Sequence, residues 1–230
     1  MAITINHRFF NRLTSTASYD KVNIVIIGTF NPGLPDLSKL NPTEKAQFEE
    51  IEKSKKFKKF NEVKNFYDRP QNRFWKIMDF INDNEFYLKN SLDTKNHNGL
   101  KFYVGMDREQ VFQKQQQFCY SRKVLITDIA KTINPISFCH IYDNFPDTAI
   151  EKASPIWNTE DIIEVIKKHN PEKVLINFNA DSKTTPNICS QISKISNRFP
   201  DKLIPSLKST SGAAGYKYDE LIENWKEHFA

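Results

Sequence analysis

The chain has 230 residues, of which 39% are hydrophobic and 27% are charged, and its formal net charge at pH 7 is +5. This length suits one large domain or two small ones, and the absence of a visible linker favours a single domain over residues 1–230. The apolar fraction excludes disorder over the whole chain. No apolar run approaches the roughly 20 residues that cross a bilayer, and the N-terminus lacks the apolar centre of an export signal. We therefore expect a cytoplasmic protein with no membrane partner.

The cysteines and histidines show no metal-binding pattern. Cys119, Cys139 and Cys189 are widely spaced, which is typical neither of a disulfide framework nor of a zinc site or a four-cysteine iron–sulfur cluster. The five histidines lack close metal-ligand spacing, so we interpret each as a surface or capping residue. We expect no metal and no cofactor. The positive charge permits a polyanionic partner without requiring one.

The predicted elements alternate between strands and helices. Continuous runs of apolar, β-branched residues indicate strands that are buried on both faces of a parallel sheet, and apolar residues at helical spacing indicate helices. In chain order we predict a strand at 22–27, helices at 72–82 and 107–118, a strand at 123–127, a helix at 159–168, a strand at 173–178, a helix at 185–199, a weaker strand at 202–205 and a helix at 218–229. Thr159 is the predicted N-cap of its helix. This order predicts a three-layer α/β/α fold around a central, mainly parallel four-stranded sheet.

A lysine-rich insertion lies between about residues 36 and 64 and carries Phe48, Phe57 and Phe60 among its charges. It has two interpretations. One is a helical excursion whose phenylalanines dock on the domain while the lysines face water, and the other is an arm that contacts phosphates. Interspersed glutamates dilute the positive charge, which favours the first interpretation.

The first predicted strand runs directly into residues 28–33, GTFNPG. Such a sequence is typical of a tight turn at the carboxyl end of a parallel strand, where open α/β sheets place their ligands. Asn31 would lie at the tip of this turn, where its amide can hold a water molecule or the edge of a substrate. A turn without any functional role is the alternative interpretation. The segment is not a dinucleotide-binding GxGxxG motif.

Two further segments extend this pattern. Residues 66–75, FYDRPQNRFW, place aromatic residues before a turn and a helix, and residues 207–215, LKSTSGAAG, form a loop of small residues before the last helix. Together with Asn31-Pro32-Gly33 they resemble the uracil-DNA glycosylase superfamily. The mismatch-specific thymine/uracil branch of that superfamily pairs a strand-end G-x-N-P-G with a downstream aromatic-A-H-P-x-N-R-F-W. Residues 177–180, NFNA, resemble a segment of the hypoxanthine-type branch.

The resemblance implies a monofunctional DNA glycosylase of DNA repair. Such an enzyme flips a uracil, or a related deaminated or mismatched base, out of the duplex and hydrolyses its N-glycosidic bond without a cofactor. Its partner would be DNA, and it would act as a monomer. Carried over to this sequence, the resemblance makes Asn31 the catalytic residue that orients water, makes Thr29, Phe30, Tyr67 and Asn179 base-binding, and makes Arg73, Ser209, Thr210, Ser211, Gly212 and Ala213 DNA-binding.

The sequence also departs from the family pattern. Thr29 stands where the mismatch branch has glycine, Asp68 and Arg69 replace the usual Ala-His pair, and Ser209 stands where many branches carry a histidine. These departures keep two alternatives open. One is a nucleic-acid-binding protein on the same fold with weakened catalysis, and the other is an α/β enzyme that acts on a free nucleotide.

Overall fold

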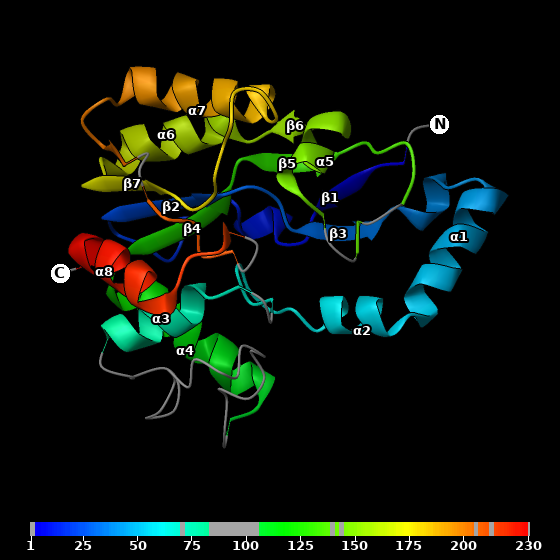
Figure 1. Cartoon of the computed structure of the whole chain (residues 1–230), viewed down its shortest axis with the longest axis horizontal. Coiled ribbons are helices and arrows are strands. Elements are labelled where there is room, and N and C mark those ends of the chain that lie inside the picture. Colours follow the sequence, from blue (N-terminus) through cyan, green and yellow to red (C-terminus); the bar gives the residue numbers. More distant parts are fainter. Residues whose placement is uncertain are drawn as a thin grey trace.

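The chain folds into an α/β structure with two sheets (Figure 1). The computed structural model describes residues 3–69, 72–82, 106–138, 141–142, 145–204, 207–211 and 214–229. One sheet is parallel, in the order β4–β2–β7–β8, and the other is antiparallel, in the order β3–β1–β5–β6. Among these residues, no helix combines the length and the apolar character needed to span a membrane.

The parallel sheet consists of the strands that the apolar runs predict. They are β2 (Ile24–Gly28), β4 (Val124–Asp128), β7 (Lys173–Ile176) and β8 (Leu203–Ile204). Ile26 at the centre of β2 pairs with Ile126 of β4 on one side and with Leu175 of β7 on the other. The prediction of an α/β fold built on parallel strands is therefore confirmed.

Helices cover both faces of the parallel sheet (Figure 1). One face is covered by α3 (Phe74–Ile81), α4 (Arg108–Ser121) and α8 (Tyr218–Phe229), and the other by α6 (Thr159–His169) and α7 (Pro186–Arg198). Alternate residues of β2 face the two layers, because side chains point to opposite faces along a strand. Ile26 packs in the cluster that contains Phe74 and Trp225, whereas Val25 and Ile27 pack with the isoleucines of α6 and α7. Thr159 is the first residue of α6 and not its N-cap as predicted, because Asn158 precedes it at the cap position.

The expectation of a single central sheet is wrong, because a second, antiparallel sheet lies beside the parallel one. Its strands are β1 (Ile5–His7), β3 (Pro32–Pro35), β5 (Ala130–Ile133) and β6 (Ile156–Trp157). Ile5 and Ile133 form part of its buried core. The short helix α5 (Asp147–Lys152) contributes Ile150 to the same cluster.

The two sheets are joined by their own strands. β2 continues through a short turn into β3, and β4 continues into β5 after Ile129 alone. β2 and β4 are neighbours in the parallel sheet, but their continuations separate and β1 lies between them, antiparallel to both. The strands separate at residues 29–31 and at Ile129, and we call this point the fork. It lies at the carboxyl end of the parallel strands and places the N-terminal strand against them.

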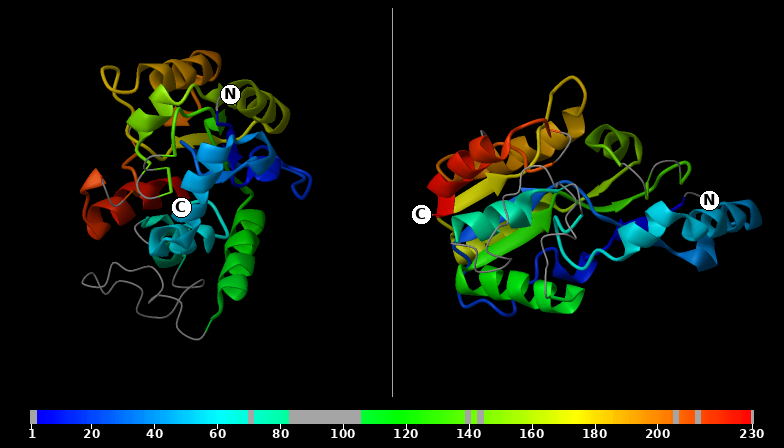
Figure 2. Two further views of the ribbon diagram at one scale, coloured as in Figure 1. Left: turned by 90° about the vertical axis from the view of Figure 1, so that its right-hand side faces the viewer. Right: turned by 60° about the horizontal axis from the view of Figure 1, so that its bottom comes forward.

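The lysine-rich insertion forms α1 (Pro42–Lys53) and α2 (Lys55–Asn61), which project at the end of the molecule away from α8 (Figures 1 and 2). Its phenylalanines are buried against Tyr142, with ring centroids of Phe48, Phe57 and Phe60 at 5.7, 5.2 and 5.4 Å from that ring. The insertion therefore docks through its aromatic side chains, as the first interpretation predicts.

Candidate functional site

The carboxyl ends of three parallel strands bring polar side chains together at the fork. Asn31 follows β2, Asp128 ends β4 and Asn177 follows β7. The chain passes from the central strand β2 to β4 on one side and then returns to β7 on the other. Such a reversal of strand order is where open α/β sheets place their ligands.

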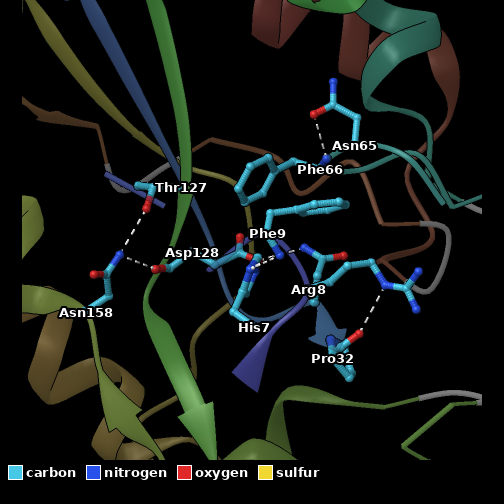
Figure 3. Close-up of polar contacts among 10 residues, drawn as sticks. His7, Arg8, Phe9, Pro32, Asn65, Phe66, Thr127, Asp128 and Asn158 are labelled. Atoms are coloured by element: carbon cyan, nitrogen blue, oxygen red, sulfur yellow. Dashed lines mark hydrogen bonds and ion pairs between the residues drawn. The ribbon is translucent and has the colours of Figure 1, made fainter. Parts of the chain in front are cut away.

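A buried carboxylate, Asp128, is the centre of this group. Asp128 is 1% exposed, and its Oδ2 accepts a hydrogen bond from the Nδ2 of Asn31 at 2.7 Å. The Nε2 of His7 lies 2.7 Å from the same oxygen. Figure 3 shows Asp128 between His7 and Asn158, whose Nδ2 donates to the backbone oxygen of Asp128 and to Oγ1 of Thr127. The end of β4 is thus fixed from both sides.

The hydrogen bonds of His7 define its tautomer. The backbone N–H of Phe9 donates to Nδ1 of His7 at 3.0 Å, so Nδ1 carries no proton. The proton of the neutral ring is then on Nε2, which donates to Asp128. His7 is only 2% exposed, and its ring stacks on Phe66 with centroids 5.4 Å apart. The prediction of a surface or capping role is wrong for this histidine, because the fork buries it.

Asp128 also sets the orientation of the Asn31 amide. An ionised carboxylate only accepts hydrogen bonds, so the amide nitrogen of Asn31 must face Asp128 and its carbonyl oxygen must point elsewhere. This oxygen accepts no hydrogen bond from any residue that the structure describes. Asn31 itself is half-buried, and its backbone oxygen accepts from the N–H of Arg8 at 2.7 Å. The carbonyl oxygen of Asn31 is therefore an acceptor of fixed orientation at the carboxyl edge of the sheet.

Gly28 allows two polar groups to approach the end of β2. A Cβ atom on Gly28 would lie 2.3 Å from Oδ1 of Asp128 and 2.6 Å from the hydroxyl of Tyr67, which are distances that real Cβ atoms do not adopt. Both oxygens are buried, and neither forms a hydrogen bond of standard geometry with the part of the chain that the structure describes. Burial and the nearby Asp128 carboxylate raise the pKa of Tyr67 well above its ordinary value, and Asn177 opposes this shift. The Tyr67 hydroxyl therefore stays protonated beside the carboxylate.

Tyr67, a predicted base-binding residue, places its hydroxyl against Gly28 at the end of β2. It is 8% exposed, has a positive φ of 57°, and packs on Phe74 with ring centroids 4.7 Å apart. The structure thus brings Tyr67 to the site but covers most of its ring.

The loop at 207–211 is tied to two other predicted segments. The backbone N–H of Thr210 donates to Oδ1 of Asn177 at 2.9 Å, and its hydroxyl donates to Oδ1 of Asn72 at 2.9 Å. Thr210 is fully buried and Ser209 nearly so, while Ser211 is half-buried. The motifs before α3, after β7 and before α8 therefore meet at one place, although they are far apart in the sequence.

Arg73, a predicted DNA contact, forms hydrogen bonds to the backbone of this loop. Its guanidinium donates to the backbone oxygens of Ser211, at 2.8 Å, and of Tyr216, and its N–H donates to the backbone oxygen of Thr210 at 3.0 Å. The side chain is nearly buried, so in this structure it organises the loop. Gly212 and Ala213, the remaining predicted loop contacts, lie outside the described residues.

The other predicted base-binding residues lie in the segments that follow β2 and β7. The half-buried Thr29 hydrogen-bonds to Asp147 at the start of α5, and Phe30 packs edge-on against His7 with centroids 5.5 Å apart. Burial raises the pKa of Asp147 to about 6, although the hydrogen bond from Thr29 opposes the shift. Asn179 is exposed in the loop after β7 and makes no hydrogen bond with any described residue.

Sequence reasoning missed His7 and Asp128 as site residues. Asp128 carries a signal, since an acidic residue that ends a buried apolar strand needs hydrogen-bond donors. His7 carries none, because its strand has three residues and its partner lies 121 positions away.

Comparisons of the chain with protein families, with functionally characterised proteins and with solved structures gave no significant match. Over the described part of the chain, no group of three or more histidine, cysteine, aspartate or glutamate side chains is arranged to hold a metal ion. Cys119 and Cys189 are free thiols, and Cys139 lies outside the described residues.

Proposed function

We propose that the protein is a monofunctional DNA glycosylase that hydrolyses the N-glycosidic bond of uracil, or of a related deaminated or mismatched base, in DNA. The observation that carries this proposal is the side chain of Asn31. The buried Asp128 carboxylate holds its amide nitrogen, and its carbonyl oxygen accepts from none of the described residues at the carboxyl edge of the sheet. An acceptor fixed in this way can hold a water molecule against a reacting carbon atom.

In the proposed reaction the target nucleotide leaves the base stack and its sugar comes to lie beside Asn31. The bond between C1′ and the base breaks, and the base leaves with the bonding electron pair. The sugar acquires oxocarbenium character, which the nearby Asp128 carboxylate stabilises because opposite charges attract in a buried site. Water held by the Asn31 oxygen adds to C1′ and releases its proton to solvent, and the departing base takes up a proton. The backbone N–H groups of Thr29 and Phe30 are the proposed donors to the base.

The convergence of the motifs supports this assignment. The turn after β2, the segment before α3 and the loop before α8 are the parts of the sequence that resemble the glycosylase superfamily. Hydrogen bonds join Asn72 before α3, Asn177 after β7 and Thr210 before α8 at one edge of the parallel sheet, and the hydroxyl of Tyr67 lies against Gly28 at the end of β2. A single site formed from all of them is what a shared function requires.

The activity is testable with oligonucleotides that carry uracil, thymine opposite guanine, or hypoxanthine, in single and double strands. We expect the wild-type protein to leave abasic sites on at least one of them, and Asn31→Ala to lower the rate about 100-fold or more because the water loses its acceptor. Asn197→Ala, on the exposed side of α7, is the matched control and should keep the wild-type rate. Absence of product on every substrate would refute the enzymatic proposal.

One observation favours a second candidate, a nucleic-acid-binding protein with weakened catalysis. The Tyr67 ring is packed on Phe74 and largely covered, so it offers little surface on which a base can stack. In that case DNA would bind with a strong salt dependence, no abasic product would form, and Asn31→Ala would leave the affinity unchanged. Saturable binding of a free nucleoside without any DNA binding would instead indicate an enzyme of small nucleotides.

A further inference from the structure

Two arginines converge on one phenylalanine at the edge of the fork. The guanidinium carbon of Arg8 lies 4.5 Å from the ring centroid of Phe60 in α2, and that of Arg69 lies 4.6 Å from the same centroid. The contacts place two positive charges on a single aromatic ring. They also join the N-terminal strand, the insertion and the segment before α3.

Each guanidinium has unused donors. Arg8 donates through Nε to the backbone oxygen of Pro32 at 3.3 Å and through Nη1 to Asn61, but its buried Nη2 has no partner among the described residues. The guanidinium of Arg69 makes no hydrogen bond to any residue in the described ranges, and its Nη2 is buried. Neither side chain forms an ion pair with a carboxylate among those residues.

This arrangement is electrostatically unfavourable without a counter-ion. Burial and, to a smaller extent, the neighbouring positive charge of Arg8 lower the pKa of Arg69 to about 10, although Asp128 opposes the shift. Burial also lowers the pKa of Arg8. Buried charges in proteins are normally paired, because an unpaired one loses its hydration without compensation. Asp128 attracts Arg69, but no ion pair joins the two side chains.

The pair borders the proposed catalytic group. The backbone N–H of Arg8 donates to the backbone oxygen of Asn31, and Arg69 lies two residues after Tyr67. Both arginines are half-buried as residues, and each keeps part of its surface in contact with solvent.

We infer that Arg8 and Arg69 form a binding site for a phosphate group. A planar guanidinium donates two parallel hydrogen bonds to a phosphate, and the several oxygens of one phosphate can serve two guanidiniums at once. The inference rests on the geometry of this pair and does not depend on the glycosylase proposal. The phosphate could belong to a DNA backbone or to a free phosphate or phosphate monoester, and these sources share the same recognition chemistry.

The test is isothermal titration calorimetry of the full chain with two probes, inorganic phosphate and the dinucleotide TpT. We expect Arg8→Met and Arg69→Met each to weaken binding roughly 10-fold or more, since each removes a charge-assisted pair of hydrogen bonds. Arg69→Lys should weaken binding less, because it keeps the charge but not the planar donors. Tighter binding of TpT than of inorganic phosphate would identify the DNA backbone as the source, and equal or weaker binding a free phosphate.

Two arginines serve as controls. Arg12 also lies over a phenylalanine, with its guanidinium carbon 5.1 Å from the Phe9 centroid, but its Nη2 donates to Asn65 at 2.6 Å. Arg198 is an exposed charge at the end of α7. Arg12→Met and Arg198→Met should bind phosphate within about twofold of wild type, and far-UV circular dichroism checks that every variant is folded.

The inference is overturned if the wild-type protein binds neither probe, or if folded Arg8→Met and Arg69→Met bind as the wild type does. Neither outcome depends on turnover. Asn31→Ala should keep phosphate binding, so a failed glycosylase assay and a failed phosphate site remain distinguishable.

Discussion

A single buried carboxylate, Asp128, organises the candidate site. One of its oxygens accepts from Asn31 and His7, and the other faces Tyr67 and the end of β2 at Gly28. Because the carboxylate has no proton to donate, only one orientation of the Asn31 amide satisfies it. The catalytic role proposed for Asn31 therefore depends on a residue that need not touch the substrate.

We predict that Asp128→Asn lowers kcat about 10- to 100-fold with little change in KM. The new amide can donate as well as accept, so the Asn31 amide is no longer held in one orientation, and the negative charge beside the sugar is lost. Steady-state excision assays at a series of substrate concentrations measure both parameters. Asp201→Asn, at an exposed position, is the control. A folded Asp128→Asn protein with the wild-type kcat would show that Asp128 does not position Asn31.

For single residues, the sequence predicts a functional role only where that role depends on local structure. Asn31 is recognisable because a turn after an apolar strand is a local pattern. The role of Asp128 depends on donors that lie far away in the chain. Arg8 and Arg69 lie close together because both contact the Phe60 ring of α2. Such contacts leave no periodic signal.

Among the elements, the parallel strands were predictable and the antiparallel ones were not. Burial on both faces gives β2, β4 and β7 continuous apolar runs. In contrast, β1 and β6 have three and two residues, and β3 begins and ends with proline, which is uncommon inside a sheet. These segments become strands because the fork opens a position for β1 between β3 and β5.

The start of α5 carries a pH-dependent contribution to stability. Burial raises the pKa of Asp147 from 3.8 to about 6, so the folded state binds this proton more tightly than the unfolded chain does. Folding then becomes less favourable as the pH rises from about 4 to above 6, because the folded protein must give up that proton. We predict that Asp147→Asn matches the wild type near pH 4 and exceeds its stability by about 1–2 kcal/mol near pH 7, after allowance for partial exposure.

Urea unfolding at a series of pH values measures this difference. Asp181→Asn is a contrasting variant, since hydrogen bonds from the N–H groups of Thr184 and Lys183 lower the pKa of Asp181. Removing that carboxylate should cost stability at pH 7 and not increase it. A constant difference between Asp147→Asn and wild type at all pH values would contradict the expected burial of Asp147.

Across the whole molecule, the two sheets share the strands that leave the fork. β2 leads into β3 and β4 leads into β5, and the backbone N–H groups of Ile129 and Ala130 donate to Gly28 and Thr29 at the junction. Neither sheet can therefore separate without breaking the hydrogen bonds at the fork. The sequence predicts one domain from the lack of a linker, and the shared strands give that prediction a physical basis.

We predict that both sheets unfold in one cooperative transition. Ile5 is fully buried in the antiparallel sheet and Ile26 in the parallel sheet, so Ile5→Ala and Ile26→Ala should each cost about 2–4 kcal/mol. Ile136→Ala, at a residue that is 95% exposed, should change the stability by less than about 0.5 kcal/mol. In a Trp75→Phe/Trp225→Phe background, Trp157 in β6 is the remaining tryptophan and reports on the antiparallel sheet, and far-UV circular dichroism is dominated by the helices that cover the parallel one. Fluorescence and circular dichroism should therefore give the same midpoint in each variant, whereas an earlier loss of the Trp157 signal in Ile5→Ala would mean that the antiparallel sheet unfolds independently.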